Sequence, residues 1–359
     1  MNITDKATAI VLTQGLLNTM DAKTAHGLIR GTERFTIAGI IDPRYAGKDA
    51  GEVLDGKHRN IPVYATVTDA LATIKEIQYC IIGVATHGGI LPKEFVCIIE
   101  DCIQQGISII NGLHQQLSDH ASIAELAREH EVELIDIRKP KRWDEMHFWN
   151  GSIHEVNAPI IAVLGMDCAM GKRTTCRMML QACNENNLHA EMIYTGQTGW
   201  LQGGRYGFIF DTTLNDFISG EVEHAVVSCF KETNADILFI EGQSSLRNPS
   251  GPCGSELLVS GNAKYTVLVY APKRIYYDDL PEWGEIPAVQ SEIDLINMYG
   301  SKVIALALNT EHCTDEEVFF YQAKLEQELN ITVLLPLQEG VHKIVPLLKK
   351  LIISHKELT

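Results

Sequence analysis

Residues 165–175, with the sequence GMDCAMGKRTT, have the composition of an anion-binding loop. A short apolar run at 160–164 precedes them and good helix formers follow, so the segment is expected to join a buried strand to a helix. Backbone N–H groups of such a loop and of the helix N-terminus hold an anion, and Lys172 adds a positive charge. The residues expected at this phosphate site are Gly165, Asp167, Cys168, Ala169, Met170, Gly171, Lys172, Arg173, Thr174 and Thr175.

The loop departs from the common nucleotide-binding pattern G-x-x-x-x-G-K-[ST] at two points. One additional residue separates the glycines, and Arg173 stands where that pattern has the hydroxyl that binds magnesium. A guanidinium suits a phosphate because it donates two hydrogen bonds in one plane, whereas Thr174 would reach a metal only if the helix start were shifted. Three interpretations stay open: a nucleotide site, a site for another phosphate, and a plain strand–turn–helix capped by Thr174 or Thr175.

Acidic residues near the ends of other expected elements are candidates for catalysis. Glu241 and Gln243 follow the apolar run 237–240. In phosphate-loop domains an acidic residue at such a place commonly meets magnesium or a bound water, and loop residues after buried strands rarely owe their identity to packing. Both are therefore predicted to be catalytic. Asp216, at the start of an expected helix, is either a further catalytic acid or a helix cap.

Substrate contacts are expected from polar residues in the neighbouring loops. The residues predicted to bind substrate are Gln197, Thr198, Arg205 and Arg247. The first two leave an expected strand, and glycines keep the loop after them pliable. An arginine either holds a substrate carboxylate by paired hydrogen bonds or lies on an outer surface.

These residues must be positioned by alternating strand-like and helix-like segments. Strands are predicted at 7–12, 35–41, 79–84, 107–111, 132–136, 160–164, 190–195, 237–241, 265–270, 303–309 and 332–335. Helices are predicted in the first part of the chain at 22–30, 67–77, 92–104 and 122–130. Such alternation predicts parallel sheets covered by helices, with ligands at the carboxyl ends of the strands.

The alternation is interrupted once, which places a domain boundary. We expect an α/β protein with a Rossmann-like parallel sheet at 1–140, a connection at 141–157, and a P-loop NTPase-like doubly wound domain at 158–359. Prolines and large aromatic residues near the boundary indicate an ordered connection rather than a flexible linker. In the second domain, Glu221 and Glu223 are interpreted as a solvated helix face.

The first domain carries only part of a nucleotide-binding signature. Asp42 ends the second predicted strand, where an acidic ribose ligand often stands, but the first strand is followed by a single glycine, Gly15, instead of the glycine fingerprint. The domain therefore either binds a nucleotide, or is inert, or shapes the substrate site.

The composition limits the classes of function. Acidic residues outnumber basic ones, 46 to 30, over 359 residues, and the formal charge is −16. This charge disfavours broad binding to nucleic acid or to anionic membranes, and no apolar run is long enough to span a bilayer. The nine cysteines form no C-x-x-C pair, so reduced thiols in the cytoplasm are expected. A chain of this kind is expected to form a homo-oligomer.

The loop resembles that of dethiobiotin synthetase and its relatives, which share the longer glycine spacing and a G-x-D start, with Asp167 at the matching place. In that group a threonine follows the lysine directly, whereas here Arg173 intervenes.

Over nearly its whole length the chain also resembles the D-glutamate N-acetyltransferase family. The matching pieces are GMDCAMGKRTT at 165, TGQTGW at 195, DTTLNDFISGEVE at 211, EGQSSLRNP at 241, IALALNTE at 304 and, earlier, HGLIRGTERFTIAGIID at 26, DAGEVLDG at 49 and LIDIRKP at 134. Relatives read G-T-D at the loop start and E-G-Q-G-S-L-x-H-P after the strand. Here Met166, Ser244 and Asn248 replace the threonine, the second glycine and the histidine.

The resemblance implies transfer of an acetyl group from acetyl-CoA to the amino group of a small acidic amino acid. Coenzyme A carries phosphates that the loop would bind. The transfer needs a general base and donors for the oxyanion; Glu241 or Asp216 would be the base, and Arg247 or Arg205 would hold the carboxylate.

Two alternatives remain. The first is an ATP- or GTP-dependent ligase or kinase acting on a small carboxylate or amino acid, with Thr174 and Glu241 near magnesium. The second is a nucleotide-sensing regulator that uses its first domain as a partner surface.

Overall fold

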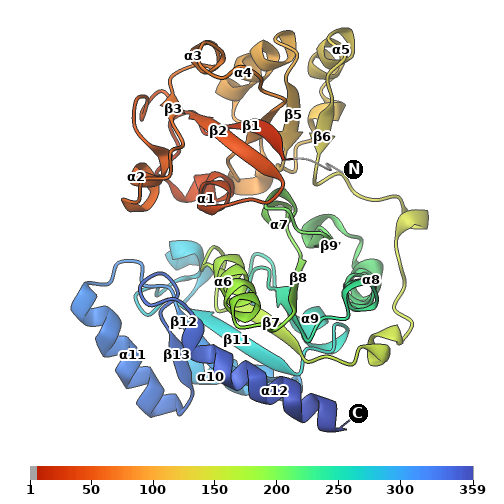
Figure 1. Ribbon diagram of the computed structural model, residues 1–359, viewed down its shortest axis with the longest axis vertical. Helices are drawn as coiled ribbons and strands as arrows, with labels where there is room; N and C mark the ends of the chain where they lie inside the picture. Colours follow the sequence, from red (N-terminus) through yellow and green to blue (C-terminus); the bar gives the residue numbers. More distant parts are fainter. Residues whose placement is uncertain (1–5, 359) are drawn as a thin grey trace. The chain divides into compact units, whose positions relative to one another are not determined.

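A computed structural model describes residues 6–358, apart from the side chains of His87 and Leu358. The chain divides into two compact units (Figure 1). The first contains the described residues up to 140 together with 197–203, and the second contains 141–196 and the described residues from 204 onward. Among the described residues no helix combines the length and the apolar character needed to cross a bilayer.

The first unit is built on a parallel sheet whose strand order is β3-β2-β1-β4-β5-β6 over the described residues. This order, with its reversal between β1 and β4, is that of the Rossmann fold. The strands are β1 (Ala7–Leu12), β2 (Phe35–Ile41), β3 (Val63–Tyr64), β4 (Tyr79–Ile82), β5 (Ser108–Asn111) and β6 (Leu134–Asp136). The helices are α1 (Lys23–Arg30), α2 (Ala50–Asp55), α3 (Val67–Leu71), α4 (Lys93–Gln104), α5 (Ala121–Glu129) and α7 (Gln197–Leu201).

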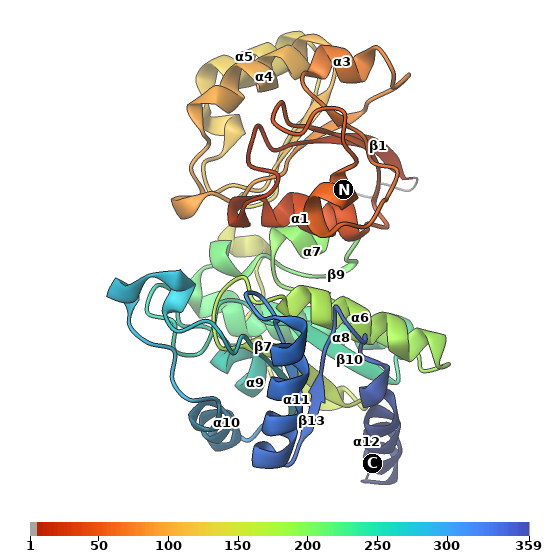
Figure 2. The same ribbon diagram turned by 90° about the vertical axis from the view of Figure 1, so that its left-hand side faces the viewer.

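Both faces of this sheet are buried. Because successive residues of a strand point to opposite sides, each strand can contribute to two apolar cores. Along β1, Ile10 and Leu12 enter one apolar core and Ala9 and Val11 the other. The first core is shared with α4 and α5, which lie side by side (Figures 1 and 2). Covered on both sides, such strands have the nearly continuous apolar sequence of a parallel sheet.

The second unit is built on a parallel sheet of strand order β13-β12-β11-β7-β10-β8-β9 over the described residues. Its strands are β7 (Ile160–Gly165), β8 (Ala190–Tyr194), β9 (Tyr206–Gly207), β10 (Ile237–Glu241), β11 (Tyr265–Tyr270), β12 (Lys302–Leu308) and β13 (Thr332–Leu334). Its helices are α6 (Lys172–Glu185), α8 (Asn215–Thr233), α9 (Ser255–Val259), α10 (Val289–Met298), α11 (Asp315–Leu329) and α12 (Val345–Leu358). Strand β7 lies between β10 and β11, and every residue of it is buried.

The predicted fold class is confirmed, and all eleven predicted strands exist within two residues of their expected ends. The sequence pattern missed α2, and it missed α7, because residues 197–201 were expected to form a loop. It also missed β3 and β9, which are strands of two residues each. A strand of two residues has no periodicity to detect, so only its pairing with a neighbour defines it. The helix predicted at 67–77 ends early, at Leu71.

The connection at 141–157 is ordered because two buried carboxylates of α8 hold it. Glu221 accepts hydrogen bonds from Lys141 Nζ (2.6 Å) and from the backbone N–H of His147 (3.0 Å). Glu223 accepts from the N–H groups of Asn150 and Gly151, at 2.7 and 2.8 Å. The interpretation of these two glutamates as a solvated face was wrong, since each is 2% exposed. Burial of a carboxylate is tolerated here because donors satisfy it.

Candidate active site around the loop between β7 and α6

The loop after β7 has the backbone geometry of an anion site. Ala169 and Gly171 have φ angles of 51° and 94°, and α6 begins immediately afterwards at Lys172. Left-handed residues in such a turn direct consecutive N–H groups to one side. The first N–H groups of a helix also lack acceptors within that helix. The segment therefore presents donors at a helix N-terminus, where a negative charge is favoured.

Lys172 lies inside the loop. Its side chain is buried, and Nζ donates to the carbonyl oxygens of Asp167 (2.6 Å) and Ser244 (2.7 Å). Burial lowers the pKa of Lys172, and the neighbouring Cys168 and Asp167 partly oppose this shift. Gly165 permits this packing, because a Cβ there would lie 3.0 Å from the Lys172 Cδ. The ammonium joins the loop to the segment that follows β10.

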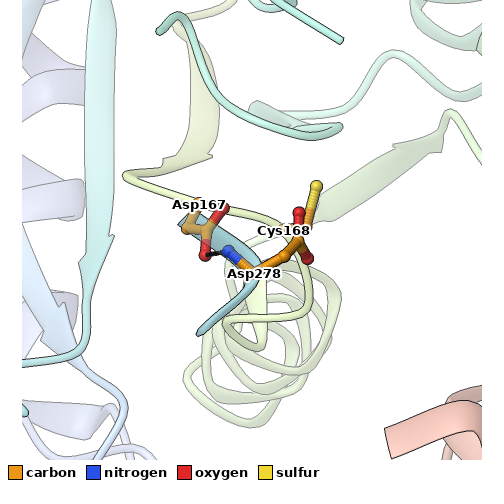
Figure 3. A group of neighbouring side chains, drawn as sticks. All are labelled: Asp167, Cys168 and Asp278. Carbon is orange, nitrogen blue, oxygen red and sulfur yellow. Dashed lines mark hydrogen bonds between the residues drawn. The ribbon is translucent and has the colours of Figure 1, made fainter. Parts of the chain in front are cut away.

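Asp167 is the centre of a buried hydrogen-bond network and has no exposed surface. Asn248 Nδ2 donates to Oδ1 at 2.7 Å, while Arg274 Nη1 (3.0 Å) and the Asp278 N–H (2.8 Å) donate to Oδ2. Figure 3 shows the bond between Asp278 and Asp167. Arg274 also donates to the carbonyl of Cys168 and to the carboxylate of Glu311, both at 2.7 Å. The loop is thus fixed by residues that follow β10, β11 and β12.

Asp167, Cys168 and Asp278 have potential metal-ligating atoms within 4.8 Å of one another (Figure 3). Both oxygens of Asp167 already accept hydrogen bonds, and the guanidinium of Arg274 lies against one of them. A divalent ion would have to displace these donors and lie close to a second cation. Burial also raises the pKa of the Cys168 thiol, so the thiolate that a metal prefers is disfavoured. This group fits a structural role in holding the loop better than it fits metal binding.

Glu241 ends β10 beside the loop and is 3% exposed. The N–H of Thr195 donates to Oε2 at 3.3 Å, and Arg173 Nη1 lies 3.6 Å from Oε1. Burial raises the pKa of Glu241, although Arg173 and the Thr195 N–H act in the opposite direction. A buried carboxylate with a raised pKa has the properties of a general base.

Gln243 extends this arrangement. Its Nε2 donates to Thr195 Oγ1 at 3.0 Å, and that hydroxyl donates to the carbonyl of Glu241 at 2.7 Å. Thr195 therefore contacts both Glu241, the last residue of β10, and Gln243, which follows that strand. Thr174 and Thr175 are in the first turn of α6, where Thr174 is half-buried and Thr175 is buried.

The other predicted site residues have partners of their own. Arg247 donates through Nε to the buried Glu292 (2.7 Å) and through Nη1 to Ser291 (3.1 Å). Arg205, with a side chain 72% exposed, pairs with Glu232 at 2.6 Å. Asp216 is exposed in the first turn of α8.

Gln197 and Thr198 begin α7, which is part of the first unit. Thr198 Oγ1 lies 3.4 Å from Thr24 Oγ1 of α1, and Leu201 is fully buried in the core of that unit. In the same unit Asp42, considered above as a ribose ligand, is buried and accepts hydrogen bonds from Thr13 Oγ1 (2.8 Å) and the N–H of Leu17 (3.1 Å). Its carboxylate holds the turn after β1.

Sequence reasoning did not identify Arg274, Asp278 and Glu311 as loop residues, and it noted Asn248 only as a departure from relatives. The available signal was their position, because each follows a strand that pairs in the same parallel sheet. Carboxyl ends of parallel strands meet at one edge. Which of the polar residues there face Asp167 depends on loop conformations such as the left-handed φ of 50° at Asp278.

Comparison with known proteins agrees with this architecture. A D-glutamate N-acetyltransferase from Pseudoalteromonas sp. is 30% identical over 273 residues, which cover 74% of this chain and 79% of that protein. A second, from Tritonibacter scottomollicae, is 26% identical over 272 residues, with the same shares. The crystal structure of a DUF1611 family protein from Anabaena variabilis ATCC 29413 is similar, with a TM-score of 0.87 and 25% identity over 97% of this chain and 100% of that one.

Two family models match the two parts of the chain. Residues 43–140 match the Rossmann-like domain of unknown function DUF1611_N, and residues 147–345 match the P-loop domain of unknown function DUF1611_C. Together with the relatives above, these matches show that the chain belongs to the DUF1611 family, with a Rossmann-like domain followed by a P-loop domain.

Proposed function

We propose that this protein is an N-acetyltransferase that moves an acetyl group from acetyl-CoA to the amino group of an acidic amino acid. Two relatives that share three quarters of the chain bear the name D-glutamate N-acetyltransferase. Acetyl transfer to an amine requires anion-binding donors for substrates that carry phosphate or carboxylate, and a base for the amine proton. The donors of the loop and the buried carboxylate of Glu241 support the proposal, because they are suited to these two tasks.

The observation that carries the proposal is the pairing of Arg173 with Glu241, 3.6 Å apart. In nucleotide-hydrolysing loops, the lysine is followed by a serine or threonine whose hydroxyl binds magnesium. An acidic residue at the end of a neighbouring strand faces the same ion. Here a guanidinium provides a fixed positive charge next to that acid. The chemistry of these donors supports anion binding without a metal, which acetyl transfer permits.

Glu241 has the environment of the base. It would accept a proton from the ammonium group of the amino acid, and the freed amine would attack the thioester carbonyl carbon. The C–S bond then breaks, the thiolate of coenzyme A takes the second proton that the attacking nitrogen must lose, and Glu241 releases the first proton to solvent. N–H groups of the loop are candidates for the oxyanion of the tetrahedral intermediate. Asp216 is the second candidate base, although it is exposed in α8.

The alternative of an ATP- or GTP-dependent ligase or kinase predicts a different dependence on metal. It requires Thr174 and Glu241 to share magnesium, at the place where Arg173 lies 3.6 Å from the Glu241 carboxylate. We therefore rank it second.

One experiment separates the two functions. The purified protein is incubated with acetyl-CoA and a panel of D- and L-amino acids, and thiol release and acetylated product are measured with and without a chelator. Parallel reactions contain ATP or GTP with magnesium. We expect acetylation of an acidic amino acid that the chelator leaves unchanged. Magnesium-dependent nucleotide turnover without acetylation would contradict the proposal.

A further inference from the structure

The phosphates of acetyl-CoA and the general base cannot both lie beside the same loop residue, because the phosphates are far from the thioester and the base must be close to the reacting amine. In acetyl-CoA the pantetheine arm separates the phosphates from the thioester by roughly 15 Å when extended, the reach of four or five residues. A general base must come within hydrogen-bond distance of the reacting amine. Glu241 lies 3.6 Å from Arg173, the residue next to Lys172. If Arg173 and Lys172 held the cofactor phosphates, Glu241 would lie an arm's length from the thioester.

Electrostatics around the loop point in the same direction. The charged side chains in the contacts of the loop comprise three cations and five carboxylates, namely Lys172, Arg173, Arg274, Asp167, Glu241, Asp278, Asp279 and Glu311. A diphosphate would add negative charge to this group of side chains, in which the carboxylates already outnumber the cations. An amino acid brings its own ammonium group with its carboxylates, so it adds less charge and can pair with both signs.

The dimensions of the Arg173–Glu241 pair also match an amino acid. The carboxylate and the amino group of an α-amino acid are attached to one carbon atom and lie only a few ångströms apart. A guanidinium and a carboxylate separated by 3.6 Å are thus spaced to receive these two groups from the same molecule. Arginine is the residue best suited to hold a carboxylate in a fixed plane.

We propose, on the basis of the acetyltransferase function above, that the loop between β7 and α6 binds the acceptor amino acid instead of the cofactor phosphates. Arg173 and the N–H groups at the start of α6 hold its α-carboxylate. Glu241 receives the α-ammonium group and takes its proton. This assignment lets the loop and the base act on one small molecule, and it moves the phosphates of acetyl-CoA away from Arg173.

The proposal is tested by measuring KM separately for the two substrates in Arg173→Met, which removes the charge and keeps most of the side-chain volume. A charge-assisted hydrogen-bonded contact contributes enough that its loss should raise the acceptor KM by roughly 10- to 100-fold. The KM for acetyl-CoA should change by less than about twofold, because in this assignment Arg173 makes no contact with acetyl-CoA. Arg142→Met is the control, since Arg142 is 75% exposed and pairs with Asp144; neither KM should change.

Calorimetry with the acceptor alone gives a second readout that does not depend on turnover. The wild-type protein should bind the amino acid in the absence of acetyl-CoA, and Arg173→Met should lose at least about tenfold in affinity. A rise in the KM for acetyl-CoA with an unchanged acceptor KM would overturn the assignment and return the loop to the cofactor. If the wild type acetylated no amino acid, the proposed function would fail, whereas Arg173-dependent binding of the amino acid would still support the site.

Discussion

Arg173 and Glu241 form a charge pair beside the loop, with 3.6 Å between Nη1 and Oε1, although they are 68 positions apart in the sequence. The glutamate is almost fully buried, while the arginine side chain is 21% exposed. One partner can thus reach a ligand while the other is kept in an environment of low polarity. This relationship is the basis for the catalytic predictions.

Replacement of Glu241 by glutamine should abolish the base without changing the shape of the site. General bases accelerate their reactions by roughly 10²- to 10⁴-fold, so we expect kcat/KM to decrease by a factor in that range. In the wild type, kcat/KM should rise with pH as Glu241 loses its proton. Because burial raises the pKa of Glu241, the rise should be centred above the ordinary carboxylate range. The variant should lack that limb of the profile; a retained limb would assign it to another group.

Replacement of Lys172 by methionine should weaken ligand binding more than folding. The ammonium is buried, and burial lowers its pKa. An uncharged side chain of similar length avoids its desolvation cost, which offsets part of the loss of the hydrogen bonds to the carbonyls of Asp167 and Ser244. Loss of a charged donor near the ligand should lower affinity by about tenfold or more. Thermal shift with saturating acceptor or acetyl-CoA measures this. A ligand-induced rise in Tm equal to that of the wild type would show that Lys172 takes no part in binding.

Arg274→Met should strongly destabilise the second unit. The Arg274 side chain is 1% exposed and lies against Asp167, which has no exposed surface. Removal of one partner leaves a buried charge uncompensated, which costs about 3–5 kcal/mol of the free energy of unfolding. Urea unfolding checks the value. Arg205→Met, which breaks an exposed pair with Glu232, should change stability by less than about 1 kcal/mol; equal losses in the two variants would refute the argument.

Ser244 occupies a backbone conformation that suits glycine, with φ of 35°. Its carbonyl accepts from Lys172, and its hydroxyl lies 3.4 Å from Cys168 Sγ. A left-handed conformation costs an L-residue about 1–2 kcal/mol, so Ser244→Gly should be more stable than Ser244→Ala by about 1 kcal/mol. Both variants lose the hydroxyl, and their comparison isolates the backbone. Equal free energies of unfolding would mean that the turn carries no strain.

The fastening of the connection by Glu221 should depend on pH. Burial raises the pKa of Glu221, but hydrogen bonds from Lys141 and His147 outweigh it and leave the pKa below the ordinary value of 4.5. Glu221 therefore stabilises the folded state at pH values above its ordinary pKa, and this stabilisation is lost as the pH falls through the lower pKa that Glu221 has in the folded state. Limited proteolysis at 141–157 should accelerate in that acidic window. In Glu221→Gln cleavage should already be faster at neutral pH, and an unchanged rate there would contradict this role.

Much of the architecture was determined by the sequence alone. Apolar runs such as the one that forms β7 (Ile160–Gly165) are legible because strands buried on both faces must be apolar throughout. Glycines and a lysine between such a strand and a helix likewise predict the loop, because its N–H groups and the helix start are adjacent in the chain. Local periodicity and local backbone geometry are properties that a sequence carries directly.

The tertiary structure decided which side chains meet at that loop. Glu221 shows this for burial, since a helix with apolar residues all around gives no local sign that the connection at 141–157 covers its glutamates. Arg274 and Asn248 show it for the site, because they reach Asp167 from segments that follow β11 and β10, the two strands that flank β7 in the sheet. Pairing order and loop conformation set these contacts. They depend on the packing of distant segments, which no short window of sequence contains.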